Sequence, residues 1–256
     1  MSTGEVEIDN YEILQKLGEG GSSDVYLARQ KTLDRKVVLK VLKTNTLNKR
    51  SIIRFQNEAK ALSKLNHPNI ASVYDFGQSK SGDLYLSIEF VDGIDLSALI
   101  SRQGEIPLDD AIDIAIQLCR ALDHAHKVGI VHRDIKPANI MITDLTPGKN
   151  TDEHQSLLNA KLLDFGISKL TEDATGFGAS ITDSGEAAES SSTFPSSAMK
   201  GAVTTGSGLI GSPLFMSPEQ CQGKPTSKFS DHYSLGCVLY NMLCGKPTFH
   251  GELPTN

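Results

Sequence analysis

The chain has 256 residues, of which 39% are hydrophobic and 22% charged, and its formal net charge is −6. The acidic balance argues against a nucleic-acid-binding protein, because such proteins usually carry a basic excess. No run approaches the roughly 18 apolar residues that cross a bilayer, and the N-terminus lacks the basic start of a signal peptide. The four cysteines show no metal-type spacing, so we expect a cytoplasmic protein with buried free thiols.

The first third of the chain predicts a mostly β unit. Residues 11–42 have the composition of three successive strands, with a glycine-rich turn between the first two. Two further strands are expected near residues 71–76 and 84–90, separated by the hairpin signal Gly82-Asp83.

A single helix interrupts these strands, and we expect it within residues 48–65. Phe55, Ala59 and Leu62 follow one another at i, i+4 and i+7, which places them on one apolar face. The β-rich unit then ends near Val91.

The second part of the chain predicts helices. Pro107 with Asp109 and Asp110 suits a helix start, and Gly129 suits its end. Between them we expect an apolar stripe, and a further helix is predicted over residues 230–244. The residues of the expected stripe are Ile112, Ile116, Cys119 and Leu122.

Two segments have a composition that predicts irregular structure. Residues 143–160 are polar and rich in turn formers. Residues 171–210 are dominated by Ser, Thr, Gly and Ala, and such a segment buries too little apolar surface to offset its ordering entropy.

The glycine-rich turn is the first motif with a chemical interpretation. Its backbone can approach phosphates closely and direct N–H groups at them. A plain β-turn explains the same glycines, whereas a dinucleotide site would need a helix after them, and here a strand follows. The motif runs from Gly18 through Glu19, Gly20, Gly21, Ser22, Ser23 and Asp24 to Val25.

Lys40 ends an apolar strand fifteen residues after Val25. Glu58 lies beside the apolar face of the predicted helix, so its carboxylate can be directed inward toward Lys40. The two residues could hold phosphates together, although a surface charge pair explains either one alone.

Residues 131–140 carry a denser pattern. Asp134, Lys136 and Asn139 stand at i, i+2 and i+5 between apolar residues, and a second carboxylate, Asp164, leaves an apolar strand downstream. Asn139 and Asp164 offer the hard oxygen ligands that suit Mg²⁺. The alternative for this segment alone is a polar surface loop.

Taken in order, these motifs resemble the signature set of the protein kinase family. Lys136 resembles the Ser/Thr class, and the segments 216–220 and 230–236 are most similar to its bacterial members. The resemblance implies an α+β, two-lobed fold, with a β-rich N-lobe over residues 11–91 and a partial C-lobe over 92–256. It also implies that 171–210 is a long activation-loop insertion, and we expect the C-lobe to be incomplete after Asn256.

The resemblance also implies roles for individual residues. Asp134 would be the catalytic base and Lys136 would neutralise charge on the phosphoryl group. Asn139 and Asp164 would hold Mg²⁺ with ATP. ATP itself would be bound by Leu17, Gly18, Glu19, Gly20, Gly21, Ser22, Ser23, Asp24, Val25, Val38, Lys40, Glu58, Glu89, Val91 and Met141, while Leu62, Val73, His132 and Phe165 resemble a hydrophobic column between the lobes.

Arg133 beside the catalytic aspartate implies activation by phosphorylation, because an exposed arginine there can pair with a phosphate. The expected phosphosites are Thr204, Thr205 and Ser207. Glu219 is expected to lack the arginine that pairs with this carboxylate in the family.

The resemblance implies an ATP-dependent kinase that phosphorylates Ser/Thr hydroxyls on protein substrates, with self-association for trans-autophosphorylation, no nucleic-acid partner and no membrane segment. The alternative is a kinase-like scaffold that binds nucleotide but has little activity. A small-molecule kinase is disfavoured by the long activation segment and by Ser217-Pro218-Glu219 at its end.

Overall fold

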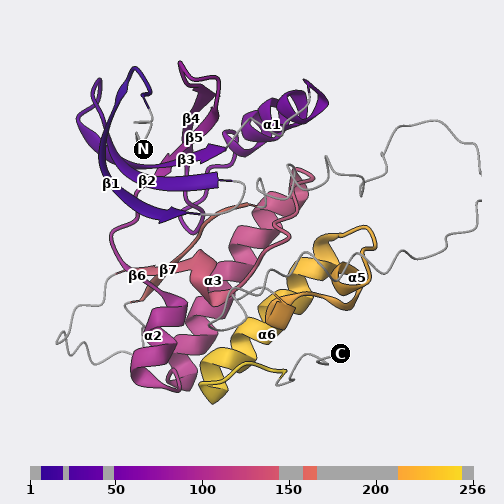
Figure 1. Cartoon of the computed structure of the whole chain (residues 1–256). Helices are drawn as coiled ribbons and strands as arrows, with labels where there is room; N and C mark the ends of the chain where they lie inside the picture. The colour runs from indigo at the N-terminus through magenta and orange to yellow at the C-terminus, as the bar shows by residue number, and fades with distance from the viewer. Residues whose placement is uncertain (1–6, 20–22, 43–48, 144–157, 166–212, 250–256) are drawn as a thin grey trace, which may run out of the picture.

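The structure is a computed structural model of the chain. It describes residues 7–19, 23–42, 49–143, 158–165 and 213–249, and the following account concerns these residues. A β-sheet with one helix forms the upper part of the molecule and helices form the lower part (Figure 1).

The upper part is a five-stranded antiparallel sheet with strand order β1-β2-β3-β5-β4. All five strands predicted from the sequence are confirmed. Gly82 adopts a φ of 93° in the turn before β5, which explains the hairpin signal. The strands are β1 (Tyr11–Glu19), β2 (Ser23–Gln30), β3 (Arg35–Leu42), β4 (Val73–Gln78) and β5 (Leu84–Glu89).

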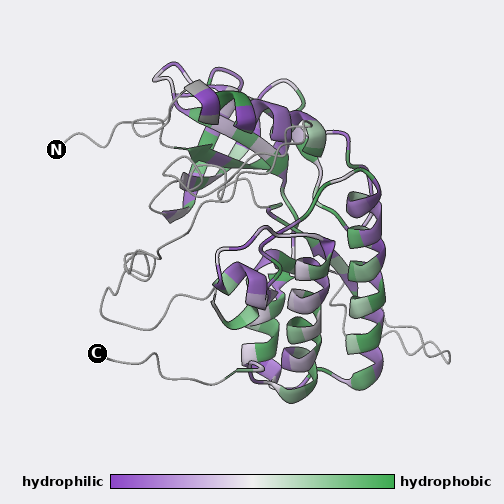
Figure 2. Cartoon of the chain, turned by 90° about the vertical axis from the view of Figure 1, so that its right-hand side faces the viewer, coloured by the Kyte–Doolittle hydropathy of each residue, from purple (hydrophilic) through white to green (hydrophobic). Residues whose placement is uncertain are grey.

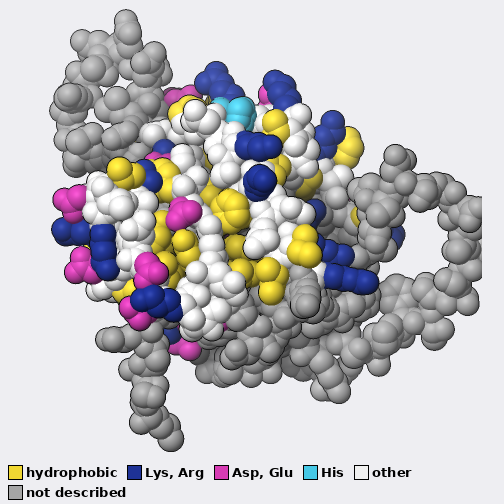
Figure 3. Space-filling view, turned by 90° about the horizontal axis from the view of Figure 1, so that it is seen from above, with side chains coloured by type: hydrophobic (Ala, Val, Ile, Leu, Met, Phe, Trp, Pro, Cys, Tyr) yellow, Lys and Arg dark blue, Asp and Glu magenta, His cyan; other side chains and the backbone are white. Residues whose placement is uncertain are grey.

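Helix α1 (Lys49–Leu62) packs its apolar face against the sheet. Phe55, Ala59 and Leu62 are all buried, so the face predicted from their spacing is confirmed. Seen from above, charged side chains surround apolar ones on this part of the molecule (Figure 3).

The lower part is mainly helical (Figure 2). It contains α2 (Leu96–Gln103), α3 (Leu108–Lys127), the short α5 (Pro218–Cys221) and α6 (Lys228–Cys244), with the 3₁₀ turns η2 (Pro137–Asn139) and η4 (Pro213–Phe215). A small antiparallel sheet joins β6 (Ile94–Asp95), β7 (Ile140–Thr143) and β8 (Asn159–Leu162). The sequence analysis did not predict α2 or β6. Within the described ranges, every helix is too short or too polar to span a bilayer.

Helix α3 begins and ends where the sequence predicted, but the predicted stripe is wrong. Ile112 and Ile116 are more than 40% exposed and Cys119 is exposed; of the four residues only Leu122 is buried. The buried face instead carries small residues, which let α3 approach α6 and β8 closely. Its members are Ala111, Ile114, Leu118, Ala121, Leu122 and Ala125.

Helix α6 begins two residues earlier than predicted and ends as expected. Ser227 and Ser230 form a capping box at its start, and Gly245 closes its end in the left-handed conformation. These caps fix the first turn of α6, where Asp231 is buried.

The expectation of buried thiols is only partly correct. Cys237 is buried, Cys244 is half-buried, and Cys119 and Cys221 are exposed; all four are free. Exposed thiols occur because Cys119 lies on the outer face of α3, opposite the face that packs.

Backbone hydrogen bonds join the upper and lower parts behind the site. The N–H of Ala71 donates to the Leu162 carbonyl, and the N–H of Leu162 donates to the Asn69 carbonyl, both at 2.9 Å. The Asn69 side chain adds a hydrogen bond to the Ala160 carbonyl. The segment before β4 is therefore tied directly to β8, which leads into Asp164.

Candidate active site

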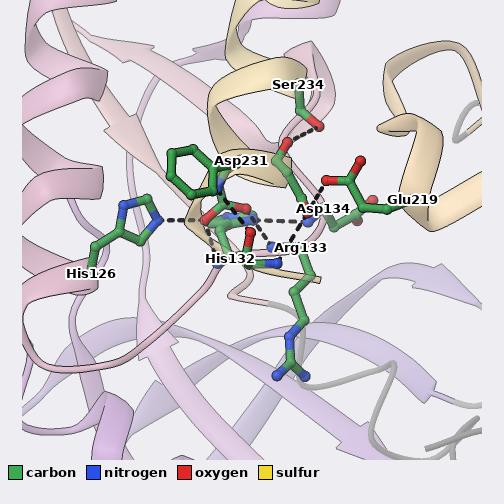
Figure 4. A network of polar contacts seen from close by, with 10 residues as sticks. His126, His132, Arg133, Asp134, Glu219, Asp231 and Ser234 are labelled. Carbon is green, nitrogen blue, oxygen red and sulfur yellow. Dashed lines mark hydrogen bonds and ion pairs between the residues drawn. The ribbon is translucent and has the colours of Figure 1, made fainter. Parts of the chain in front are cut away.

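The loop between α3 and β7 is held by a buried carboxylate of α6. Asp231 is only 1% exposed and accepts hydrogen bonds from the backbone N–H groups of His132 at 2.9 Å and Arg133 at 2.8 Å. His126 Nε2 lies 2.7 Å from the same carboxylate (Figure 4). The Arg133 guanidinium points away from this network (Figure 4). Asp231 thus fixes the backbone that leads into Asp134.

His132 is fully buried between this loop and Phe165. Its Nε2 lies 2.7 Å from the Leu163 carbonyl and its Nδ1 accepts the N–H of Asp134 at 3.2 Å. One nitrogen donates and the other accepts, which requires the neutral imidazole. Burial lowers the pKa of His132, in agreement with that state.

The Asp134 carboxylate is half-buried and oriented by two neighbours. Lys136 Nζ donates to its Oδ2 at 2.8 Å and Asn139 Nδ2 donates to the same oxygen at 3.0 Å. The side chains of Asp134 and Lys136 remain 23% and 21% exposed. The pair is therefore preorganised but still reachable by a substrate.

Asn139 and Asp164 are brought together by short backbone links. Asn139 Nδ2 also donates to the Asp134 carbonyl, so the Oδ1 of this amide is the atom left to bind a cation. The N–H of Leu163 donates to the Asn139 carbonyl at 2.8 Å, just before Asp164. Asp164 has a φ of 52°, an uncommon conformation for a residue with a side chain.

Lys40 contacts Asp164 rather than Glu58. Its Nζ lies 3.4 Å from Asp164 Oδ2, and no ion pair between the described residues joins it to Glu58. The predicted Lys40–Glu58 pair is thus not formed in this structure. The reason is that the buried amine is taken up by the carboxylate arriving from β8, while Glu58 on α1 has polar contacts of its own.

Several predicted nucleotide-binding residues share one face of the sheet. Val25 pairs with Lys40 across β2 and β3, and Val38 pairs with Ile88 across β3 and β5. Cross-strand partners point to the same face, and so do residues two apart on one strand. Val25, Val38 and Lys40 therefore project from the same side. Met141 lies on β7, paired with Lys161 of β8.

The glycine-rich turn is described on both flanks. Gly18 pairs with Val25 and Glu19 with Asp24, while Leu17 is exposed. Lys16 Nζ forms ion pairs with Glu19 at 2.8 Å and Asp24 at 3.5 Å, so these two carboxylates tie the flanks together. Ser23 opens β2, whereas Gly20, Gly21 and Ser22 lie outside the described residues.

Glu89 ends β5, and its side chain has a role that its motif position did not predict. One carboxylate oxygen pairs with Lys161 Nζ on β8 at 2.5 Å, and the other accepts the N–H of Ser72 at 3.1 Å. This ion pair connects the sheet with the lower part of the molecule. Val91, two residues later, packs against the main core.

The predicted hydrophobic column is present. The rings of His132 and Phe165 lie 4.6 Å apart, and Phe165 lines a small cavity together with Leu62 and Val73. Asp164 and Ile88 also line this cavity. The column therefore runs from α1 to the loop of Asp134, behind the face that carries Lys40.

Glu219 lacks an arginine partner among the described residues, as expected, but its carboxylate is satisfied by Ser230 Oγ on α6 at 2.5 Å. This hydrogen bond lowers the pKa of Glu219. The predicted phosphosites Thr204, Thr205 and Ser207 lie outside the described residues.

Sequence reasoning assigned no role to three residues that organise the site: His126, Gln220 and Asp231. Asp231 and Gln220 stood in segments used only for the resemblance. A buried acid at the start of a capped helix is the one local signal that could have identified Asp231.

Comparison with known proteins agrees with this geometry. The family profile described as protein kinase domain matches residues 11–256. The chain belongs to the protein kinase family. This assignment confirms the resemblance found in the sequence and its two-lobed fold.

Relatives of this kinase domain are bacterial. It is 38% identical over 243 residues to the Ser/Thr-protein kinase pkn3 of Myxococcus xanthus, covering 94% of this chain and 39% of that protein. It is also 38% identical over 253 residues to PknB of Mycobacterium leprae, covering 97% and 34%. The chain thus spans between a third and two fifths of these relatives. The Mycobacterium tuberculosis PknI kinase domain has the same fold, with a TM-score of 0.65 and 24% identity over 99% of this chain and 82% of that one.

Proposed function

We propose that this kinase domain transfers the γ-phosphoryl group of ATP to Ser/Thr hydroxyls of proteins. The observation that carries the proposal is the Asp134 carboxylate, oriented by Lys136 and Asn139 on a loop that α6 holds from behind. A half-buried carboxylate in a fixed orientation suits a base that accepts a hydroxyl proton.

In this mechanism Asp134 accepts the proton of the substrate hydroxyl and orients its oxygen toward the γ-phosphorus. Lys136 is held within hydrogen-bond distance of Asp134, so its ammonium neutralises charge on the transferring group. Phosphoryl transfer asks for little covalent help, and positioning with charge stabilisation supplies most of the rate.

ATP with Mg²⁺ fits the donor set beside Asp134. Asn139 offers an amide oxygen and Asp164 a carboxylate. The described residues contain no cluster of three or more His, Cys, Asp or Glu side chains that would enclose a metal. Two oxygen ligands suit Mg²⁺, which usually keeps waters and substrate phosphates as its remaining ligands.

The nucleotide would lie between the sheet and the loop of Asp134, with residues 11–91 as N-lobe and 92–256 as C-lobe. Lys40 would bind the α- and β-phosphates. The backbone from Glu89 to Val91 would bind adenine, and the base would pack between apolar side chains of both lobes. These are Val25 and Val38 above and Met141 below.

Serine or threonine as acceptor is supported by the printed names of the bacterial relatives and by Lys136. We extend the proposal to autophosphorylation at Thr204, Thr205 or Ser207, with Arg133 as the partner of the new phosphate. Mass spectrometry of active protein would find at least one of the three modified, and their complete absence would refute this extension.

The test is incubation with ATP, Mg²⁺ and a mixed protein substrate, followed by analysis of the phosphorylated amino acids. We expect phosphoserine and phosphothreonine, and about a 10²-fold loss in Lys40→Met. Lys127→Met is the matched control, because Lys127 is exposed on α3 and distant in sequence from the motifs. Tight nucleotide binding without transfer would favour the scaffold alternative.

A further inference from the structure

Gln220 connects α5 with the catalytic loop through the two ends of its amide. Its Oε1 accepts hydrogen bonds from the Ser217 N–H at 3.0 Å and the Ser217 hydroxyl at 3.2 Å. Its Nε2 donates to the Arg133 carbonyl at 2.8 Å, across 87 residues of sequence. One end of the amide therefore caps α5 and the other holds the catalytic loop.

The Arg133 carbonyl belongs to the peptide unit that enters Asp134. The N–H of that same unit donates to His132 Nδ1 at 3.2 Å, and the preceding N–H donates to Asp231. Gln220 thus completes a set of side-chain contacts that fixes the backbone on both sides of the Arg133 Cα.

This backbone needs such support because Arg133 has a φ of 69°. A residue with a side chain adopts this left-handed conformation rarely, at a free-energy cost of about 1–3 kcal/mol, and keeps it only where its surroundings enforce it. The conformation of Arg133 sets the direction in which the chain presents Asp134.

We propose that Gln220 is a positioning residue for Asp134, acting through its hydrogen bond to the Arg133 carbonyl. The proposal rests on the function proposed above and adds a residue that the motifs did not assign. It also gives the segment ending at Ser217-Pro218-Glu219-Gln220 a direct connection to the catalytic base.

Two substitutions separate the two ends of the amide. Gln220→Glu keeps an acceptor for Ser217 but places a carboxylate oxygen against the Arg133 carbonyl. Gln220→Lys keeps a donor for that carbonyl but removes the acceptor for Ser217. Gln222→Glu is the matched control, because Gln222 is exposed and lies two residues away.

We expect Gln220→Glu to lower kcat by about 10–100-fold, because small misplacements of a catalytic group have effects of this size. KM for ATP should stay near the wild-type value, since Gln220 contacts no proposed nucleotide-binding residue. Gln220→Lys should retain more of kcat than Gln220→Glu while its melting temperature falls further. A kcat that follows melting temperature across both variants would overturn the proposal, because it would reveal a structural role alone.

Hydrogen exchange tests the same contact without relying on activity. Backbone amides of residues 131–139 should exchange faster in Gln220→Glu than in wild type and unchanged in Gln222→Glu. Unchanged exchange in Gln220→Glu would refute the positioning role. An inactive wild type with this exchange pattern would instead refute the proposed function and leave the contact supported.

Discussion

At the scale of single residues, the site depends on buried polar groups that have all their partners. Asp231 accepts two backbone N–H groups and contacts His126, and His132 uses both ring nitrogens. Such networks are stabilising only when complete, because an unsatisfied buried polar group is costly. The protonation state of His132 is therefore coupled to folding.

Acidification should destabilise the protein through His132. Its pKa is lowered in the folded state, so below about 6.5 the unfolded chain binds more protons and the free energy of unfolding falls. The slope contributed by this residue is at most about 1.4 kcal/mol per pH unit. Denaturant unfolding between pH 7.5 and 5.5 measures it.

His132→Phe provides the comparison for this pH dependence. The variant should be less stable at pH 7.5 because it lacks the hydrogen bond to the Leu163 carbonyl, but its stability should fall less steeply on acidification. The pKa of His67 is also lowered by burial, so a residual slope is expected. Identical slopes in both proteins would contradict the neutral, buried state of His132.

At the scale of elements, α3 shows where a sequence pattern fails. Large apolar residues at helical spacing indicated one face, yet the alanines and Leu118 of another face pack against α6 and β8. Single-sequence periodicity weights large side chains, whereas close helix packing selects small ones. The strands and α1 were predictable because their buried residues are large and regularly spaced.

Two alanine substitutions test the face of α3. Leu118→Ala should lower the free energy of unfolding by about 2–5 kcal/mol, because Leu118 is 1% exposed and its loss leaves a cavity. Ile116→Ala should change it by no more than about 1 kcal/mol, because Ile116 is 42% exposed. Equal losses in urea unfolding would restore the face predicted from the sequence.

The ion pair between Glu89 and Lys161 should couple β5 to β8. Both side chains are about one-fifth exposed, so single removal of either partner leaves a poorly solvated charge. A double-mutant cycle with Glu89→Gln and Lys161→Met should give a coupling free energy of about 0.5–3 kcal/mol.

The exposed pair of Asp123 and Lys127 on α3 is the control for this cycle, and its coupling should not exceed about 0.5 kcal/mol. Comparable coupling in the two pairs would mean that Glu89 and Lys161 contribute only as surface charges.

At the scale of the whole molecule, the proposed site is assembled from both lobes. Lys40 comes from β3 and Asp164 from the segment after β8, and they meet in an ion pair. The spacing of Asp134, Lys136 and Asn139 was readable because it is local. Asp231, His126 and Gln220 reach the same loop from about 90 to 105 residues away or across the fold, and one sequence contains no record of such proximity.

Binding of nucleotide should stabilise the assembled lobes by mass action. At a free ligand concentration of 100 times Kd, Mg²⁺-ATP should add about 2.7 kcal/mol to the free energy of unfolding. Asp164→Asn should lose most of the Mg²⁺-dependent part of this increment, and Asp109→Asn, at an exposed position of α3, should keep it. Equal Mg²⁺ dependence in both variants would remove Asp164 from the proposed metal site.

The most direct test of the account is the rate of phosphoryl transfer by Asp134→Asn under single-turnover conditions with saturating Mg²⁺-ATP. The substitution keeps the size of the side chain but removes the charge that accepts a proton. We predict a rate about 10²–10⁴-fold below wild type with nucleotide affinity retained. Equal rates in the two proteins would contradict the assignment of Asp134 as catalytic base.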